Sequence, residues 1–527
     1  MDGGKYFQWM IPDFKMSFYH SRYSRIFLSI TLVCLPALMS LFWVYFSFHG
    51  TPFDFVPSES DEIFYWHETL DFTHVGLDGG YYTFEERAPR SPIFHFDAHG
   101  PIFPVLYGIF GKVFGWKYAS AVLCNILVFS AALLIFLWLV KPDSRQLLLL
   151  IAFLLSFWPL PLFQNSNLQE SVHQSGVVVL SIFLFLFTSQ KEDKSFLLKA
   201  AALLFLFLIS LLRKTWTLLF LPYLLLMLRP QSKLKICLVI LLGLAIPLLV
   251  VVLHSHWQAP YPDSFFRGLK KQGLLSVSQG AYFLFQHSLE NLKQFFSFRS
   301  GHPLEVLQRY QALLLLYVSY LIWSIRTFQF KGEGWSSEFE KNTTLFHLYS
   351  LTTITVFIIL FYDVKDWRDY RVLAPYLMLL LISWIVLKMN TRWILLIILL
   401  NFTFTPVFYR SFLQKRSDNY LPDLQKIHTF SKEIEGRVSY KKGPNAWCNT
   451  VLSFVSPWPF LQPLVALPAG IGLSVVLDPH RLQFPLKSKY ILLDERGWEF
   501  LKNRSNLELV SNTQIGVLYL NLDSKCL

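Results

Sequence analysis

Long apolar runs are the feature that most limits what this chain can fold into. They recur between residues 26 and 409, and most are close to the roughly 20 residues that a helix needs to cross the hydrocarbon core of a bilayer. Soluble domains carry charge at about a quarter of their positions. Here 16% of residues are charged and 53% are hydrophobic. The sequence therefore predicts a protein that crosses a membrane many times, and it excludes a soluble globular protein.

The loops between the apolar runs predict the orientation of the chain. Loops rich in Lys and Arg stay in the cytoplasm, and here they alternate with loops that carry acids and histidines. This pattern places the N-terminus in the cytoplasm and the C-terminus on the outer side of the cytoplasmic (inner) membrane. Much of the net charge of +12 lies in these loops, so it is a topology signal and does not indicate nucleic-acid binding. We expect about eleven spanning helices, over residues 26–48, 117–140, 146–163, 176–190, 196–212, 215–229, 235–253, 311–328, 343–362, 372–388 and 392–409.

Two domains are expected. Residues 1–410 form an all-α polytopic membrane domain with two long outer loops, 49–116 and 254–310, and the first of these ends in an interfacial helix, Pro101–Trp116. Residues 411–527 are polar and form a small extracytoplasmic α/β domain. Its expected elements are a helix at Leu424–Glu435, a strand at Tyr490–Asp494, a helix at Trp498–Asn503 and a hairpin around Ser511–Asn512.

The five cysteines form no metal-binding pattern. Cys448 and Cys526 both lie in the C-terminal segment. They can form a disulfide if that segment faces an oxidising compartment.

Two adjacent acids follow the first apolar run. Asp61 and Glu62 are expected in the first turn of a helix that Ser58 caps. A carboxylate held just outside the bilayer can accept a proton from a hydroxyl substrate. The alternative is that Asp61 is only a helix-terminal acid, and these residues alone leave both interpretations open.

Four short motifs resemble one family when they are taken in order along the chain. They are Asp61-Glu62-Ile63-Phe64-Tyr65, His99-Gly100-Pro101 through Pro104, Gln169-Glu170-Ser171, and Arg368-Asp369-Tyr370-Arg371 through Pro375. Together they resemble the GT-C superfamily of membrane glycosyltransferases, in the branch of dolichyl-phosphate-mannose protein mannosyltransferases and lipid A aminoarabinose transferases. Gly100 stands where that branch often has proline, and the spacing of the last motif is loose.

The resemblance implies a glycosyltransferase. A sugar would move from a polyprenyl-phosphate-linked donor to a hydroxyl or amine of a glycan, lipid or protein acceptor on the outer face of the membrane. Asp61 is the expected base, with Glu62 orienting it or substituting for it. Tyr65 and His99 are expected to contact the substrate, and Glu170 resembles the second acidic position, which faces the same cavity in these enzymes.

Cations must offset the charge of the departing phosphate. Arg368 and Arg371 are the favoured pair, because a guanidinium can bind phosphate oxygens bidentately. Lys365 and Arg213 are the second choice for this phosphate-binding role. The alternatives are that these basic residues anchor lipid headgroups, and that Glu170 simply pairs with an outer arginine.

No cofactor is certain, although a divalent metal ion is one option. His95, Asp97 and His99 alternate, so an extended strand would place them on one face, and such spacing can bind Zn²⁺ or another divalent ion. The alternative is a polar loop with ordinary hydrogen bonds.

Three other functions stay open. An O-antigen ligase or polymerase is also polytopic and lipid-linked, but the acids of the first loop argue against it. A transporter or flippase of lipid-linked sugars would show internal repeats and charges deep within spans, and neither stands out. A scaffold of the same architecture that has lost activity would serve as an assembly partner.

Overall fold

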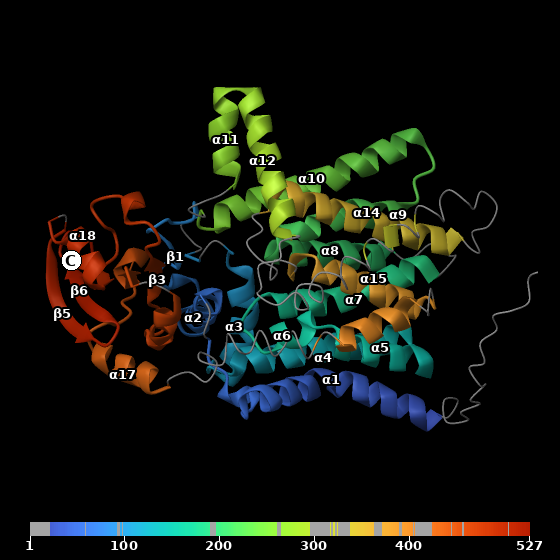
Figure 1. Cartoon of the computed structure of the whole chain (residues 1–527), viewed down its shortest axis with the longest axis horizontal. Helices are drawn as coiled ribbons and strands as arrows, with labels where there is room; N and C mark the ends of the chain where they lie inside the picture. The colour runs from blue at the N-terminus through green and yellow to red at the C-terminus, as the bar shows by residue number, and fades with distance from the viewer. Residues whose placement is uncertain are drawn as a thin grey trace, which may run out of the picture.

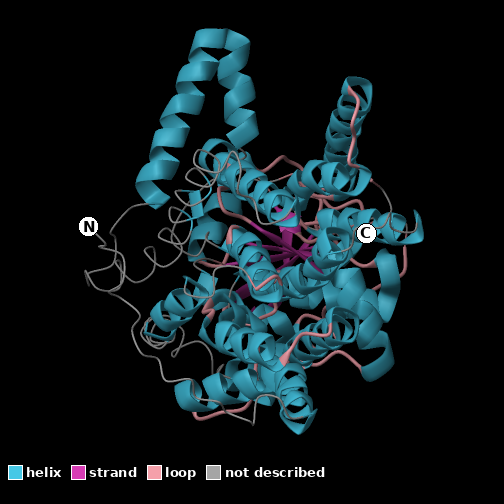
Figure 2. Cartoon of the chain, turned by 90° about the vertical axis from the view of Figure 1, so that its right-hand side faces the viewer, coloured by secondary structure: helices cyan, strands magenta, loops and turns pink. Residues whose placement is uncertain are grey.

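The computed structural model describes most of the chain. The exceptions are residues 1–21, 58–59, 92–94, 97–98, 190–195, 261–264, 296–316, 318–319, 322–323, 325–337, 363–370, 389–392, 404, 406–423, 444, 456–457, 504 and 527. The described part has a helical body, with a mixed sheet at one end of it (Figure 1). Seen end on, the strands lie behind the helices (Figure 2).

Helices make up the body, and further helices pack against the sheet. They are α1 (Arg22–Phe48), α2 (Ser60–Val75), α3 (Ile102–Phe114), α4 (Ser120–Val140), α5 (Ser144–Ser156), α6 (Pro159–Gln164), α7 (Glu170–Ser189), α8 (Phe196–Leu212), α9 (Phe220–Leu228), α10 (Lys233–Trp257), α11 (Phe265–Leu275), α12 (Val277–Phe295), α14 (Glu338–Phe361), α15 (Ala374–Val386), α17 (Leu424–Ile434) and α18 (Glu495–Leu501). A further helix covers Trp393–Thr403. The short 3₁₀ helix η4 (Lys214–Leu219) links α8 to α9.

Several helices suit a membrane. Within the described residues, α1, α4, α7, α10 and α14 are long and apolar enough to cross one. Shorter apolar helices, including α5, α8 and α15, lie beside them. Their exposed Leu, Phe and Trp side chains, such as Trp138 and Leu248, suit a lipid environment. The prediction of a mostly helical body with several helices suited to cross a membrane is confirmed. The exact number of crossings stays a prediction, because most of the expected span 311–328 lies outside the described residues.

Three sequence predictions about the body need correction. The expected span 146–163 is broken at Phe157–Trp158, where α5 ends and α6 begins with Pro159. A proline does not continue a preceding helix, because it lacks an N–H and its ring clashes with the carbonyl four residues earlier. The expected span 176–190 begins earlier, at Glu170. The expected loop 254–310 contains a helical hairpin, α11 and α12, which stands out from the body (Figures 1 and 2).

The C-terminal sheet has six strands in the order β1-β3-β2-β4-β6-β5. β1, β3, β2 and β4 pair in parallel, while β6 runs antiparallel to β4 and β5. β4 and the β5–β6 hairpin confirm two sequence predictions, and α17 confirms a third. The strands are β1 (Thr83–Phe84), β2 (Thr450–Ser453), β3 (Gly472–Val475), β4 (Tyr490–Leu493), β5 (Leu507–Thr513) and β6 (Gly516–Asn521).

One strand of this sheet comes from the loop between α1 and α4. β1 pairs with β3 in the register Thr83↔Ser474 and Phe84↔Val475. The chain just before β1 approaches the sheet closely: a Cβ atom added to Gly80 would lie 2.1 Å from the Asn449 carbonyl oxygen. Glycine is therefore required at this contact.

Polar contacts fasten α2 and β1 to residues 470–488, and we call this region the sheet junction. An Asp71 carboxyl oxygen accepts a hydrogen bond from the Gly470 N–H at 2.5 Å, and the Tyr82 hydroxyl lies 2.8 Å from the Ile471 carbonyl. The Tyr82 hydroxyl also contacts the other Asp71 oxygen. The Glu86 carboxylate accepts from the N–H groups of Lys487 and Ser488.

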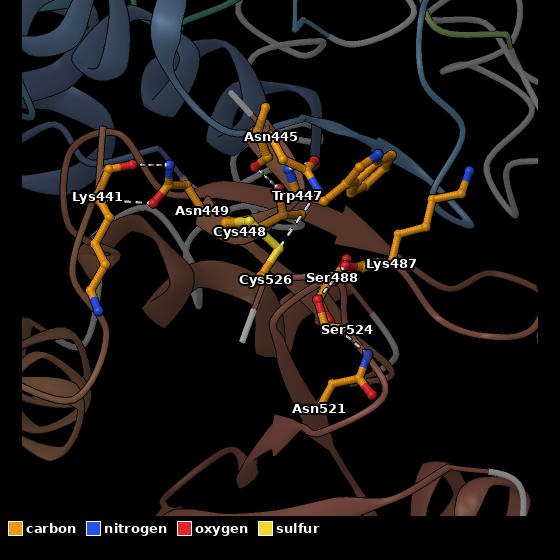
Figure 3. The surroundings of a disulfide bond; sticks show 12 residues. Lys441, Asn445, Trp447, Cys448, Asn449, Lys487, Ser488, Asn521, Ser524 and Cys526 are labelled. Carbon is orange, nitrogen blue, oxygen red and sulfur yellow. Dashed lines mark hydrogen bonds between the residues drawn. A yellow bond between two sulfur atoms is a disulfide. The ribbon is translucent and has the colours of Figure 1, made fainter. Parts of the chain in front are cut away.

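A disulfide joins Cys448 to Cys526 (Figure 3), as the sequence allowed. Next to it, Asn449 exchanges two hydrogen bonds of 2.8 Å with the backbone of Lys441. The Thr450 hydroxyl accepts a hydrogen bond from the Tyr81 N–H at 3.1 Å. The disulfide therefore fixes the part of the domain on which the strand from the α1–α4 loop docks.

Candidate functional site

The two acids that the sequence singled out lie in the first turn of α2, where the helix dipole favours negative charge. Asp61 is half-buried and Glu62 is fully buried. The Glu62 carboxylate accepts a hydrogen bond from the Asn167 N–H at 3.3 Å, and the Asn167 side chain donates to the Glu62 carbonyl at 3.0 Å. Glu62 is thus fastened to the connection between α6 and α7, while Asp61 is the more accessible acid. Ser58, the expected cap, lies outside the described residues.

Tyr65 lies one turn after Asp61 and is buried. Its ring centre is 5.1 Å from that of His99 and 5.0 Å from that of Phe103 in α3. α2 and α3 approach closely because α3 has glycine where they meet: a Cβ atom at Gly108 would lie 2.4 Å from the Phe72 ring. The structure therefore brings Tyr65 and His99 together; their expected contact with a substrate stays a prediction.

Glu170, the first residue of α7, is paired with two arginines. Its Oε1 lies 2.5 Å from Arg213 Nη2 and 3.5 Å from Arg371 Nε. The Glu170 side chain is 4% exposed, and those of Arg213 and Arg371 are 18% and 27% exposed. Arg213 was only a reserve candidate in the sequence, and it makes the shorter contact. Glu170 thus pairs with Arg213, and Arg371 joins the same cluster.

An aromatic wall fixes the arginines. Trp216 donates from its indole nitrogen to Nδ1 of His173 at 3.0 Å. The Trp216 ring stacks on Tyr376 with a centroid distance of 5.4 Å, and the Tyr376 hydroxyl donates to the Thr215 carbonyl at 2.7 Å. η4, which follows Arg213, is thereby tied to α7 and to α15, which follows Arg371. Sequence reasoning missed His173 and Trp216, although His173 lies three residues after Glu170 and hence on the same helical face.

Glu170, Arg213 and Arg371 do not neutralise one another by themselves. Two guanidinium groups share the single carboxylate of Glu170, so the three side chains carry one net positive charge. His173 adds none when its ring is neutral: because Nδ1 accepts a hydrogen bond, the proton then lies on Nε2. Buried charge is costly unless it is paired. A cluster of this kind is suited to an anion, above all to a phosphate that two guanidinium groups can bind.

Other predicted residues are placed differently or not at all. Lys365, Arg368 and Asp97 lie outside the described residues. His95 Nδ1 is 3.1 Å from the Gly79 carbonyl oxygen, and its ring contacts Tyr81, whereas His99 contacts Tyr65. The two histidines thus have different neighbours. No group of three His, Cys, Asp or Glu side chains suited to a metal ion occurs in the part of the chain that the structure describes.

Comparison with solved structures finds several similar protein chains. No family model and no curated protein matches the chain. The structure is similar to ArnT from Cupriavidus metallidurans bound to undecaprenyl phosphate, with a TM-score of 0.46, 11% identity, and 95% of this chain and 98% of that chain covered. For ArnT from the same organism in the apo state the values are 0.42, 12%, 93% and 97%. This likeness spans nearly the whole of each chain, at low sequence identity. At TM-scores below 0.5, it carries nothing about residues or chemistry.

Proposed function

We propose that this protein is a glycosyltransferase. It moves a sugar from a polyprenyl-phosphate-linked donor to a hydroxyl or amine of a glycan, lipid or protein acceptor. The reaction takes place at the membrane face on which the C-terminal domain lies. The observation that carries this proposal is the cluster of Glu170 with Arg213 and Arg371, in which two guanidinium groups meet one carboxylate at the start of a helix long and apolar enough to cross a membrane.

The arginines stabilise the phosphate leaving group. In the reaction, the acceptor oxygen or nitrogen forms a bond to the anomeric carbon of the sugar. The bond between that carbon and the phosphate oxygen breaks, and the polyprenyl phosphate departs with the electron pair. Arg213 and Arg371 offset the charge that develops on its oxygens, and Glu170 holds the two guanidinium groups in place. Lys365 and Arg368 are further proposed phosphate contacts.

The acids of α2 lie on the acceptor side of the proposed reaction. Asp61 is the proposed base that takes the acceptor proton, because it is the more accessible of the two carboxylates. Glu62 holds α2 against the α6–α7 connection through Asn167. This connection leads directly into Glu170, so one short segment joins the acids of α2 to the arginine cluster. Tyr65 and His99 are the proposed acceptor contacts beside Asp61.

The compartment is also part of the proposal. The disulfide between Cys448 and Cys526 suits an oxidising environment, which supports an extracytoplasmic C-terminal domain. The positive loops of the sequence support the same orientation.

The test is sugar transfer in membranes supplied with undecaprenyl-phosphate-linked sugars. Arg371→Ala and Asp61→Asn are each expected to lower the transfer rate by about 100-fold or more, as the loss of one catalytic electrostatic contact does. Arg229→Ala is the matched control. Arg229 ends α9 and donates to the Phe187 carbonyl at 3.4 Å, away from the cluster, and its loss should leave transfer unchanged.

The possible outcomes separate the candidate functions. Full transfer by Asp61→Asn removes Asp61 as the base. Binding of the lipid-linked sugar without any transfer by the wild-type protein overturns the enzyme proposal and favours a flippase.

A further inference from the structure

The α6–α7 turn, residues 164–174, is unusually polar for the interior of a membrane protein. Every polar side chain in it is buried, with at most 5% of each residue exposed. Buried polar groups cost free energy unless they are hydrogen-bonded. These residues are Gln164, Asn165, Ser166, Asn167, Gln169, Glu170, Ser171, His173 and Gln174.

Part of this polarity has a structural use. Asn165 donates to the Pro161 carbonyl at 3.3 Å, and Gln174 donates to the Pro159 carbonyl at 2.9 Å. Asn167 donates to the Glu62 carbonyl at 3.0 Å. In Asn167 and Gln174 the amide nitrogen is therefore anchored, which fixes the direction of the amide oxygen.

Five other side-chain atoms of the turn have no hydrogen-bond partner among the described residues. The oxygens Asn167 Oδ1 and Gln174 Oε1 have no hydrogen-bond partner there. The same holds for three nitrogens, Gln164 Nε2, Gln169 Nε2 and His173 Nε2. Folded proteins leave only a few buried polar groups unmatched, so five such atoms within eleven residues indicate that the turn is built to bind something.

The mixture of donors and acceptors limits what that ligand is. A phosphate only accepts hydrogen bonds, an ammonium group only donates them, and a metal ion requires oxygens or basic nitrogens. Hydroxyl groups both donate and accept. The turn runs into Glu170 and therefore lies beside the arginine cluster, where the phosphate of the proposed donor would sit.

We propose that the α6–α7 turn is the binding site for the hydroxyl groups of the sugar carried by the lipid donor. This inference rests on the proposed function and adds to it: the arginines bind the phosphate, and the amides of the turn recognise the sugar. Gln169 is the sharpest test residue, because its buried amide nitrogen has no hydrogen-bond partner within the described structure. Its replacement removes a ligand contact without removing a contact that holds the fold.

The experiment measures the affinity of the purified full-length protein for undecaprenyl phosphate and for undecaprenyl phosphates that carry glucose, mannose or arabinose. The wild-type protein should bind at least one sugar-linked form about tenfold more tightly than bare undecaprenyl phosphate. Gln169→Met should remove this gain and leave the affinity for the bare lipid unchanged, since one or two lost hydrogen bonds account for about tenfold. Gln164→Met, which gives up only a 3.5 Å contact with Ser171, is the second variant and should act in the same direction.

Gln146→Met is the matched control. Gln146 is also a buried glutamine, but its amide donates to the Val386 carbonyl at 2.6 Å and its oxygen accepts from the Asp143 N–H. Its loss should lower stability without changing the ratio of the two affinities. If Gln169→Met and Gln164→Met keep the full sugar-dependent gain, the turn binds only water and the inference is wrong.

Failure of the inference and failure of the proposed function are distinguishable. A wild-type protein that binds bare undecaprenyl phosphate but gains nothing from any sugar overturns the inference alone. A wild-type protein that binds none of these lipids overturns the proposed function as well.

Discussion

The α6–α7 turn and the sheet junction are both buried and polar, but they differ in how completely their hydrogen bonds are made. At the junction, both oxygens of Asp71 and both oxygens of Glu86 accept hydrogen bonds. In the turn, the side-chain oxygens of Asn167 and Gln174 accept no hydrogen bond from the described residues. Burial costs free energy in both regions, and at the junction Asp71 and Glu86 offset part of that cost with both of their carboxylate oxygens.

This difference separates polar residues that hold the fold from those that suit a ligand. A polar group buried for folding alone comes with its partner, because an unmatched group costs about 1–3 kcal/mol. The junction has exceptions of its own, such as Nε2 of His67, which is unmatched in the described structure. Asp71 and Glu86 nevertheless use both oxygens of their carboxylates. We therefore expect substitutions at the junction to change stability and substitutions around Glu170 to change both stability and the response to ligand.

Glu170→Gln is expected to have the largest effect. It removes the buried carboxylate that two partly buried guanidinium groups share, and breaking a buried pair costs up to about 3–5 kcal/mol of the free energy of unfolding. Undecaprenyl phosphate should restore part of this loss, because its phosphate supplies negative charge at the same place. Thermal unfolding in detergent, with and without the lipid, measures both quantities. A ligand-induced rise in melting temperature that is smaller than in the wild type would contradict a phosphate site at these arginines.

Glu86→Ala tests the junction. The Glu86 carboxylate accepts from the N–H groups of Lys487 at 2.9 Å and Ser488 at 2.7 Å. Ser488 is fully buried, so its N–H would lose its partner at a cost of about 1–3 kcal/mol. The melting temperature should fall, while sugar transfer per folded molecule stays unchanged. Glu508→Ala, at an exposed acid of β5, is the control that should alter neither. A tenfold loss of transfer per folded Glu86→Ala molecule would erase the distinction between the two regions.

Asp71→Asn is expected to have the smallest effect on stability, and this effect should depend on pH. Burial raises the pKa of Asp71 above 3.8, even though contacts with His67, Tyr82 and Gly470 act to lower it. The folded protein therefore keeps this proton to higher pH than the unfolded chain, so stability falls as pH rises from about 3.8 through the folded pKa. Asparagine does not titrate and removes this loss. The melting temperature of Asp71→Asn relative to the wild type should rise between pH 4 and pH 8, and a difference that is constant with pH would contradict the prediction.

The parts of the fold that the sequence predicted are those with a local signal. The membrane helices follow from runs of apolar residues, and α3 follows from its proline near the start and Gly115 at its end. The β5–β6 hairpin and β4 also have local patterns. β2 and β3 were missed because all their side chains are buried, so they lack the alternation that marks a half-exposed strand. β1 was missed because it has two residues and its partner lies at the other end of the chain.

The candidate site was predictable in part for the same reason. Asp61, Glu62 and Glu170 each carry a charge next to an apolar run, which marks them in the sequence. That Arg213 and Arg371 would meet on Glu170 depends on how α7, η4 and α15 pack, and no local pattern contains this information. The ring of Trp216 between His173 and Tyr376 is likewise visible only in three dimensions.

The pairing of β1 with β3 has a consequence for how the chain is threaded. Backbone hydrogen bonds between two strands cannot pass through a bilayer, so residues 84 and 475 must end up in the same compartment. The chain between them must then traverse the membrane an even number of times, whichever of its apolar helices do so. It also follows that β1, made early in translation, waits without its neighbour until nearly the whole protein has been synthesised, which makes closure of this sheet one of the last events of assembly.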